Sequence, residues 1–173
     1  MALQGYSAHL KNEINGFVFD PIDFGYTAIN DQNRSKQRGY DAKFNWQPSE
    51  ALTLEGYYGR LKATDGNAIT EIRRPSTTGL LSIAYQSAKW RHQVSAAYTG
   101  KSDDIFYPPV PPYQERVQMT DFTLVAVTSN VLITEQLDAF VSIDNLLGTQ
   151  FEEVFGYRRS GRTLRFGVKL RLN

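Results

Sequence analysis

The feature that most constrains this chain is an alternation of apolar and polar residues that recurs along its length. In residues 164–172 every second residue is Leu, Phe or Val, and the residues between them are Arg, Gly or Lys; residues 39–46 repeat the pattern. Successive side chains of a strand point to opposite faces, so each segment predicts a strand with one apolar face. A membrane-spanning helix needs about 20 consecutive apolar residues, and runs such as 124–127 are far shorter. The chain is therefore predicted to be all-β.

Further segments alternate in the same way and bring the predicted strands to eight. They are residues 5–19, 52–58, 81–86, 93–99, 125–131 and 137–144, the first being interrupted by Asn12. The connections alternate in length, with short turns at 47–51, 86–91 and 133–136 and long loops at 21–38, 62–77, 101–120 and 148–162. This alternation is typical of outer-membrane proteins. We predict one domain, residues 1–173, folded as an eight-stranded antiparallel up-and-down transmembrane β-barrel with short periplasmic turns and long outer loops.

The two faces of the predicted strands differ in chemistry. Trp46 and Trp90 lie beside short turns, where interfacial aromatics are expected. The apolar face, predicted to contact lipid, carries Tyr40, Phe44, Val94, Val141, Phe166, Val168 and Leu170. The other face, predicted to be an ion-paired lumen, carries Asp41, Lys43, Glu55, Asp138, Asp144, Arg165, Lys169 and Arg171. A closed eight-stranded barrel is filled by its side chains, so we predict an ion-paired plug and no pore. A soluble β-sandwich or lipocalin-like barrel is the alternative, because it also alternates.

Composition excludes several functional classes. The chain has no Cys and only two His, which excludes thiolate zinc sites and cysteine nucleophiles and leaves little for a histidine metal cluster. A net charge of +1 gives no general attraction to nucleic acid. His92 and Ser95 are three residues apart on a strand and point to opposite faces, so they cannot form the nucleophile–base pair of a hydrolase. We therefore predict no enzyme, no cofactor and no nucleic-acid partner. Residues 1–5 have no signal-peptide pattern. This is expected of a cytosolic protein or of a chain without its targeting segment.

Three loop segments are candidate binding sites. Asp103, Asp104 and Glu115 offer carboxylates for a cation, but their spacing fits no calcium loop, which favours a solvated surface. Residues 107–113, Tyr-Pro-Pro-Val-Pro-Pro-Tyr, predict a stiff segment folding over the barrel mouth, or a recognition epitope. Arg34, Lys36 and Arg38 predict a solvated basic loop, or a site for lipopolysaccharide phosphate.

The last third carries a recognisable set of motifs: Asp-Asn-Leu-Leu-Gly at 144–148, Phe-Glu-Glu-Val-Phe-Gly-Tyr at 151–157 and Ser-Gly-Arg at 160–162. With landmarks at Asn30, 39–41, 46–48, 52–54, 73–75 and 98–100, the chain resembles the C-terminal end of TonB-dependent outer-membrane receptors, which import siderophores and vitamin B12. Leu147, Gly148 and Ser160 depart from the family pattern. Arg165, Gly167, Leu170 and Leu172 resemble the outer-membrane assembly signal, although Asn173 replaces the usual terminal aromatic residue.

The resemblance implies a bacterial outer-membrane location. The implied partners are outer-membrane lipid and lipopolysaccharide, the assembly machinery and other subunits of a membrane complex. Family members have about 22 strands and a plug inside the barrel, whereas the match covers only the last eight strands, with no plug domain and no TonB box. Two interpretations follow. The chain is a structural or accessory barrel without transport activity of its own, or it is a fragment of a siderophore or vitamin import receptor.

Overall fold

The computed structural model describes the backbone of residues 1–20, 22–31 and 34–171, and their side chains except those of 15–20, 26 and 29–31. Eight strands form one antiparallel sheet in the order β1-β4-β5-β6-β7-β10-β11-β14. Their bounds are β1 Ala2–Leu10, β4 Ser35–Ser49, β5 Leu52–Thr64, β6 Thr77–Gln86, β7 Trp90–Thr99, β10 Phe122–Thr134, β11 Leu137–Asp144 and β14 Thr163–Leu170. The prediction of an all-β antiparallel fold is confirmed.

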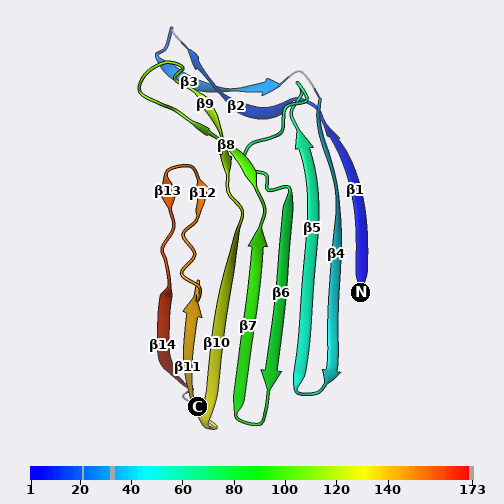
Figure 1. Cartoon of the computed structure of the whole chain (residues 1–173), viewed down its shortest axis with the longest axis vertical. Coiled ribbons are helices and arrows are strands. Elements are labelled where there is room, and N and C mark those ends of the chain that lie inside the picture. Colours follow the sequence, from blue (N-terminus) through cyan, green and yellow to red (C-terminus); the bar gives the residue numbers. More distant parts are fainter. Residues whose placement is uncertain (21, 32–33, 172–173) are drawn as a thin grey trace.

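The loops carry structure that alternation did not predict. Three of the four long connections contain hairpins, all at one end of the sheet (Figure 1): β2 Glu13–Asp20 with β3 Gly25–Asp31, β8 Ser102–Phe106 with β9 Glu115–Met119, and β12 Glu152–Val154 with β13 Tyr157–Arg158. The predicted first strand at 5–19 is wrong in its extent. The chain turns at Asn12, whose φ is 54°, so β1 ends at Leu10 and β2 belongs to the separate hairpin. The short turns lie at the opposite end, as predicted.

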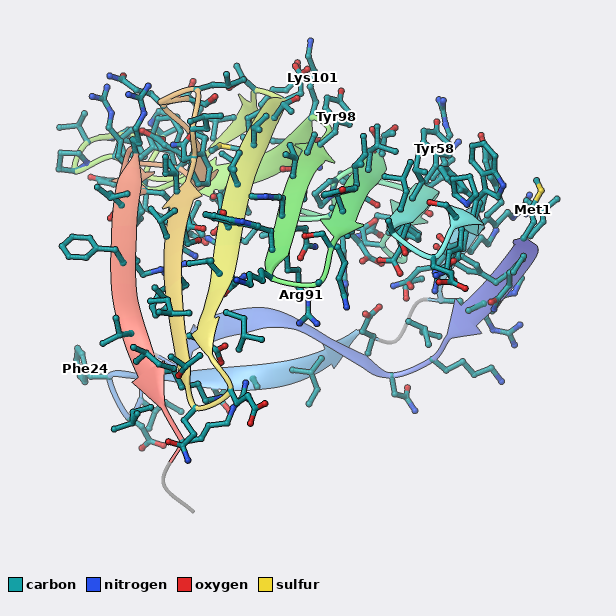
Figure 2. The ribbon with its side chains drawn as sticks, turned by 90° about the horizontal axis from the view of Figure 1, so that it is seen from below. Met1, Phe24, Tyr58, Arg91, Tyr98 and Lys101 are labelled. Carbon is teal, nitrogen blue, oxygen red and sulfur yellow. The ribbon has the colours of Figure 1, made fainter. Side chains whose placement is uncertain are left out.

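The main sheet is open in this structure. β1 pairs only with β4, and β14 only with β11, so these two strands are its edges among the described strands. The sheet curves into an arc, and its two edges stand apart (Figure 2). The predicted pairing of residues 5–19 with 162–172 is therefore not found, and a closed eight-stranded barrel is not confirmed. The curvature of the eight strands is too small to bring the two edges together.

The sheet is a single layer without a conventional core. Among the described residues, the only buried hydrophobic side chains are Ala63, 3% exposed, and Met119, 7% exposed. A soluble sandwich or lipocalin-like barrel would bury one face of each strand against other side chains, which this sheet does not do. No helix in the described part of the chain has the length and apolar character needed to cross a membrane.

Candidate functional site: two sheet faces and a loop cluster

The pairing register sorts the side chains onto two faces of the sheet. Tyr58 and Tyr98 lie on the convex face and Arg91 on the concave face (Figure 2). Directly paired residues of antiparallel strands share a face, so the register extends this assignment across all eight strands. The concave face receives seven of the eight predicted lumen residues: Asp41, Lys43, Glu55, Asp138, Asp144, Arg165 and Lys169. The eighth, Arg171, follows the end of β14 and lies beside Asp138 through an ion pair.

The charged residues of the concave face form two separate groups. Arg165 of β14 lies 2.5 Å from Asp144 of β11, and Arg171, directly after β14, lies 2.6 Å from Asp138 of β11. Lys169 is directly opposite Asp138 in the register, but the ion pair of that carboxylate is with Arg171. A hollow of about 530 Å³ lies at the short-turn end of this face, with Arg91, Asp138, Phe140, Lys169 and Arg171 among its lining residues.

The second group lies on β4 and β5, away from the first. The Tyr57 hydroxyl donates a 3.0 Å hydrogen bond to Asp41 Oδ1, and Lys43 Nζ lies 5.6 Å from the centre of the Tyr57 ring. Asn45 Nδ2 donates a 2.9 Å hydrogen bond to Glu55 Oε1. The sequence missed the part played by Tyr57, because alternation indicates the face that a tyrosine occupies and not the partner of its hydroxyl.

The convex face is apolar and open to its surroundings. The residues predicted to contact lipid all lie there and are all exposed; on β14, Phe166 is 78%, Val168 71% and Leu170 60% exposed. The other exposed members are Tyr40, Phe44, Val94 and Val141. A large exposed apolar surface of this kind normally marks contact with a membrane or with another protein.

Aromatic residues border this apolar face at both ends. Trp46 and Trp90 lie near the short turns, where His92 stacks between Trp90 and Tyr85 at ring distances of 5.4 and 6.3 Å. Toward the long loops, Tyr40, Tyr58 and Tyr98 form a second row, which the alternation of the sequence does not reveal. The space between the rows is mainly aliphatic. Two aromatic rows around an apolar band are typical of a membrane barrel exterior.

Asp104, in β8, joins three segments of the long loops. Its side chain is fully buried, with 0% exposure. Its Oδ1 accepts 2.8 Å hydrogen bonds from Arg73 Nε and from the backbone N–H of Ile105, and its Oδ2 accepts one from the backbone N–H of Phe155 at 2.8 Å. Arg73 belongs to the β5–β6 loop and Phe155 to the turn between β12 and β13. One carboxylate therefore ties these loops together.

The chemistry around Asp104 favours its charged form. Burial on its own raises the pKa of Asp104, but the N–H donors of Phe155 and Ile105 and the Arg73 guanidinium outweigh burial, so this pKa lies below its usual value. The expectation of a solvated acidic surface is thus wrong for Asp104. It holds for Glu115, which is exposed. Among the described residues, no group of His, Cys, Asp or Glu side chains is arranged to hold a metal ion.

Neighbouring contacts extend this loop cluster, defined here as Arg73, Asp103, Asp104, Arg116 and Phe155. The backbone N–H of Arg73 donates to Asp103 O at 2.7 Å, and Arg116 lies 2.7 Å from Asp103 Oδ2 while also donating to Thr70 O. The rings of Phe106 and Phe155 lie 5.1 Å apart. The sequence missed this cluster because its residues come from different loops and short hairpins, where period-two alternation is not informative.

Two of the recognised motifs have a local structural role. In the 144–148 motif, Asn145 has a φ of 50°, and its side chain exchanges hydrogen bonds with the backbone of Thr149 at 2.8 and 2.9 Å, which shapes the turn leaving β11. At Gly167, an added Cβ would lie 2.8 Å from the Phe140 ring, so glycine lets that ring cross β14. Arg165 and Leu170 lie on opposite faces of β14. Leu172 and the Asn30 side chain lie outside the described residues.

Comparisons with known proteins give a fold match without a family model. No protein-family model matches, and no curated protein matches. Solved structures do match over almost the whole chain. The Pseudomonas aeruginosa PAO1 pyoverdine outer-membrane receptor FpvA, bound to pyoverdine, has a TM-score of 0.80 at 18% identity, covering 98% of this chain and 27% of that one. The ferric-catecholate import receptor Fiu from K12 E. coli has a TM-score of 0.71 at 18% identity, covering 97% of this chain and 25% of that one.

The copper transporter OprC matches with a TM-score of 0.74 at 13% identity and covers 97% of this chain and 28% of its own. The resemblance to TonB-dependent outer-membrane receptors is therefore confirmed at the level of fold. This chain spans about a quarter of the length of the receptors that it matches. The matched proteins are receptors and transporters rather than enzymes.

Proposed function

We propose that this chain is one arc of the barrel of a TonB-dependent import receptor in the bacterial outer membrane, with ligand-facing loops at its outer end. The observation that carries the proposal is a single-layer sheet whose convex face is apolar and exposed while its concave face is charged. Such a sheet has no apolar partner within the described chain. A bilayer against the convex face and water against the concave face would satisfy both.

The open edges support a segment of a larger barrel. In lipid, the unpaired N–H and C=O groups of β1 and β14 need partners, because no water is there to bond them. Further strands at both edges would supply these partners, and the receptors that match are about four times as long as this chain. The alternative accessory barrel of eight strands requires β1 to pair with β14, which are the two edges of the sheet.

The concave charges take a different role in this proposal from the predicted plug. In a larger barrel, the pairs Arg165–Asp144 and Arg171–Asp138 line one wall of the interior instead of filling it. The loop cluster holds the outer loops in one arrangement, which limits the ordering cost of binding a ligand there. We propose a siderophore-type metal complex as that ligand, with import itself depending on the rest of the receptor.

Cysteine cross-linking in membranes distinguishes the two architectures, and the chain has no native cysteine to interfere. We expect no disulfide when Ser7→Cys in β1 is combined in turn with Leu164→Cys, Phe166→Cys or Val168→Cys in β14. The matched control is Val141→Cys with Phe166→Cys, a directly opposed pair of β11 and β14, which should cross-link. An intramolecular β1–β14 disulfide, seen as a shift on a non-reducing gel, would favour the accessory eight-stranded barrel.

A loop deletion tests whether the proline segment belongs to the fold or to the outer surface. Residues 108–112 form the middle of the loop between β8 and β9, and most of them are exposed. We expect their deletion to leave the folded, heat-modifiable gel band intact and to change binding of ligand or antibody at the outer surface. Loss of that band would make the segment part of the folded structure.

A further inference from the structure

A group of cations lies on the convex face, where charge is otherwise absent. Within the eight described strands of the main sheet, the register places only Lys36, Arg38, Arg60 and Lys62 among the charged residues on this face, and all are exposed. We call them the cationic patch. Lys36 and Arg38 were expected in a loop, but β4 begins at Ser35 and includes both. No acidic residue of these strands shares their face.

The patch concentrates positive charge without a protein counter-charge. Arg38 is directly opposite Lys62, and Arg60 is opposite Tyr40 on the same two strands. Like charges directly opposed across antiparallel strands are destabilising. Among the side chains that the structure describes, no carboxylate forms an ion pair with any member of the patch. An external anion would relieve this repulsion.

The position of the patch indicates which anion fits. It lies at the long-loop end of β4 and β5, one step beyond the exposed Tyr40 and Tyr58, whose rings are 6.1 Å apart. The apolar band begins on the other side of these tyrosines, toward the short turns. A ligand with phosphate groups and acyl chains would therefore meet cations and apolar surface in the correct order. Arg guanidinium groups bind phosphate oxygens in a bidentate manner.

We infer that the cationic patch binds the phosphate groups of lipopolysaccharide in the outer leaflet. The inference rests on the membrane orientation proposed above. A free phosphate would use the cations but would leave the adjoining apolar band uncovered, whereas a lipid covers both. The interaction is one between exposed charges, so it weakens as salt concentration rises.

The test is titration of lipid A, the phosphorylated lipid part of lipopolysaccharide, into the full chain in neutral detergent micelles. The patch variant is R38Q/R60Q/K62Q, and the control K89Q/R91Q/K101Q removes the same charge elsewhere. At about fivefold per cation near a membrane surface, the patch variant should bind about a hundredfold more weakly, and the control should change by less than about threefold. Removing the phosphates of lipid A should weaken binding to the wild type by a similar factor.

The outcomes separate this inference from the proposed function. Equal lipid A affinity of the patch variant and the wild type would overturn it, as would displacement of lipid A by millimolar inorganic phosphate, which would indicate a free-anion site. Circular dichroism of each variant confirms that its strand content is unchanged. Orientation is measured separately, as quenching of Trp46 and Trp90 by brominated acyl chains in phosphatidylcholine vesicles. If the tryptophans are quenched but the patch variant binds lipid A as tightly as the wild type does, only this inference is overturned. If the tryptophans are not quenched, the proposed function is overturned.

Discussion

Replacing Asp104 with alanine should loosen the β5–β6 loop, the β8–β9 hairpin and the β12–β13 hairpin together. The substitution leaves the backbone N–H groups of Ile105 and Phe155 without their acceptor and removes the ion pair of Arg73. Arg73 is half exposed and regains water, so we expect a loss of about 3 kcal/mol in the free energy of local opening, rather than the larger loss of a fully buried pair. Hydrogen exchange at the Phe155 amide measures it.

Glu153→Ala is the matched control, because it removes an exposed ion pair with Arg159 in the same region. Exposed pairs contribute at most about 1 kcal/mol, so exchange at Phe155 should change little. If both variants opened equally, Asp104 would not be the residue that joins the loops.

The same carboxylate should make the loop cluster sensitive to acid. The pKa of Asp104 is lowered in the folded protein, so its stabilising effect is complete above the pKa of the unfolded chain, about 3.9. The effect is lost as pH falls through the lower, folded pKa. Loop protection should therefore persist at neutral pH and decline only below about pH 4. Asp104→Asn should remove this component of the acid sensitivity.

Introducing arginine at Val168 should impair insertion into a bilayer. Val168 is 71% exposed on the convex face, and an arginine on the lipid face of a barrel costs up to about 2–4 kcal/mol, with the largest cost at the midplane. The measurement is the urea dependence of folding into vesicles. Gln4→Arg places the same side chain on the concave face beside Asp41 and should cost much less. Equal costs for the two variants would contradict the assignment of the convex face to lipid.

The strands were predictable from sequence because their alternation reports the face of each residue directly. Phe166 and Arg165 occupy the faces that their polarity predicts, as do residues 40–46 of β4. Lys36 and Arg38 of β4 and Phe140 of β11 are exceptions, because they lie on the face opposite to the one that their polarity predicts. The edges were not predictable, since a pattern of eight strands is the same in a closed barrel and in an arc. The loop cluster was also out of reach, because Arg73, Asp104 and Phe155 are brought together only by the hairpins that alternation does not detect.

In the membrane orientation proposed above, the spacing of the two aromatic rows would set a membrane thickness. Trp90 and Tyr98 are the opposite ends of the apolar face on β7, and eight steps of about 3.3 Å separate them by about 26 Å along the strand. At a tilt of about 40° the band is about 20 Å tall, and outer-membrane barrels have a band of about 25 Å. A thicker bilayer would either bury the indole or phenol groups or become thinner around the protein. Either adjustment costs a fraction of about 1 kcal/mol for each ångström of mismatch. Hydrophobic mismatch would therefore retain this sheet in a thin bilayer, independently of any protein that recognises it.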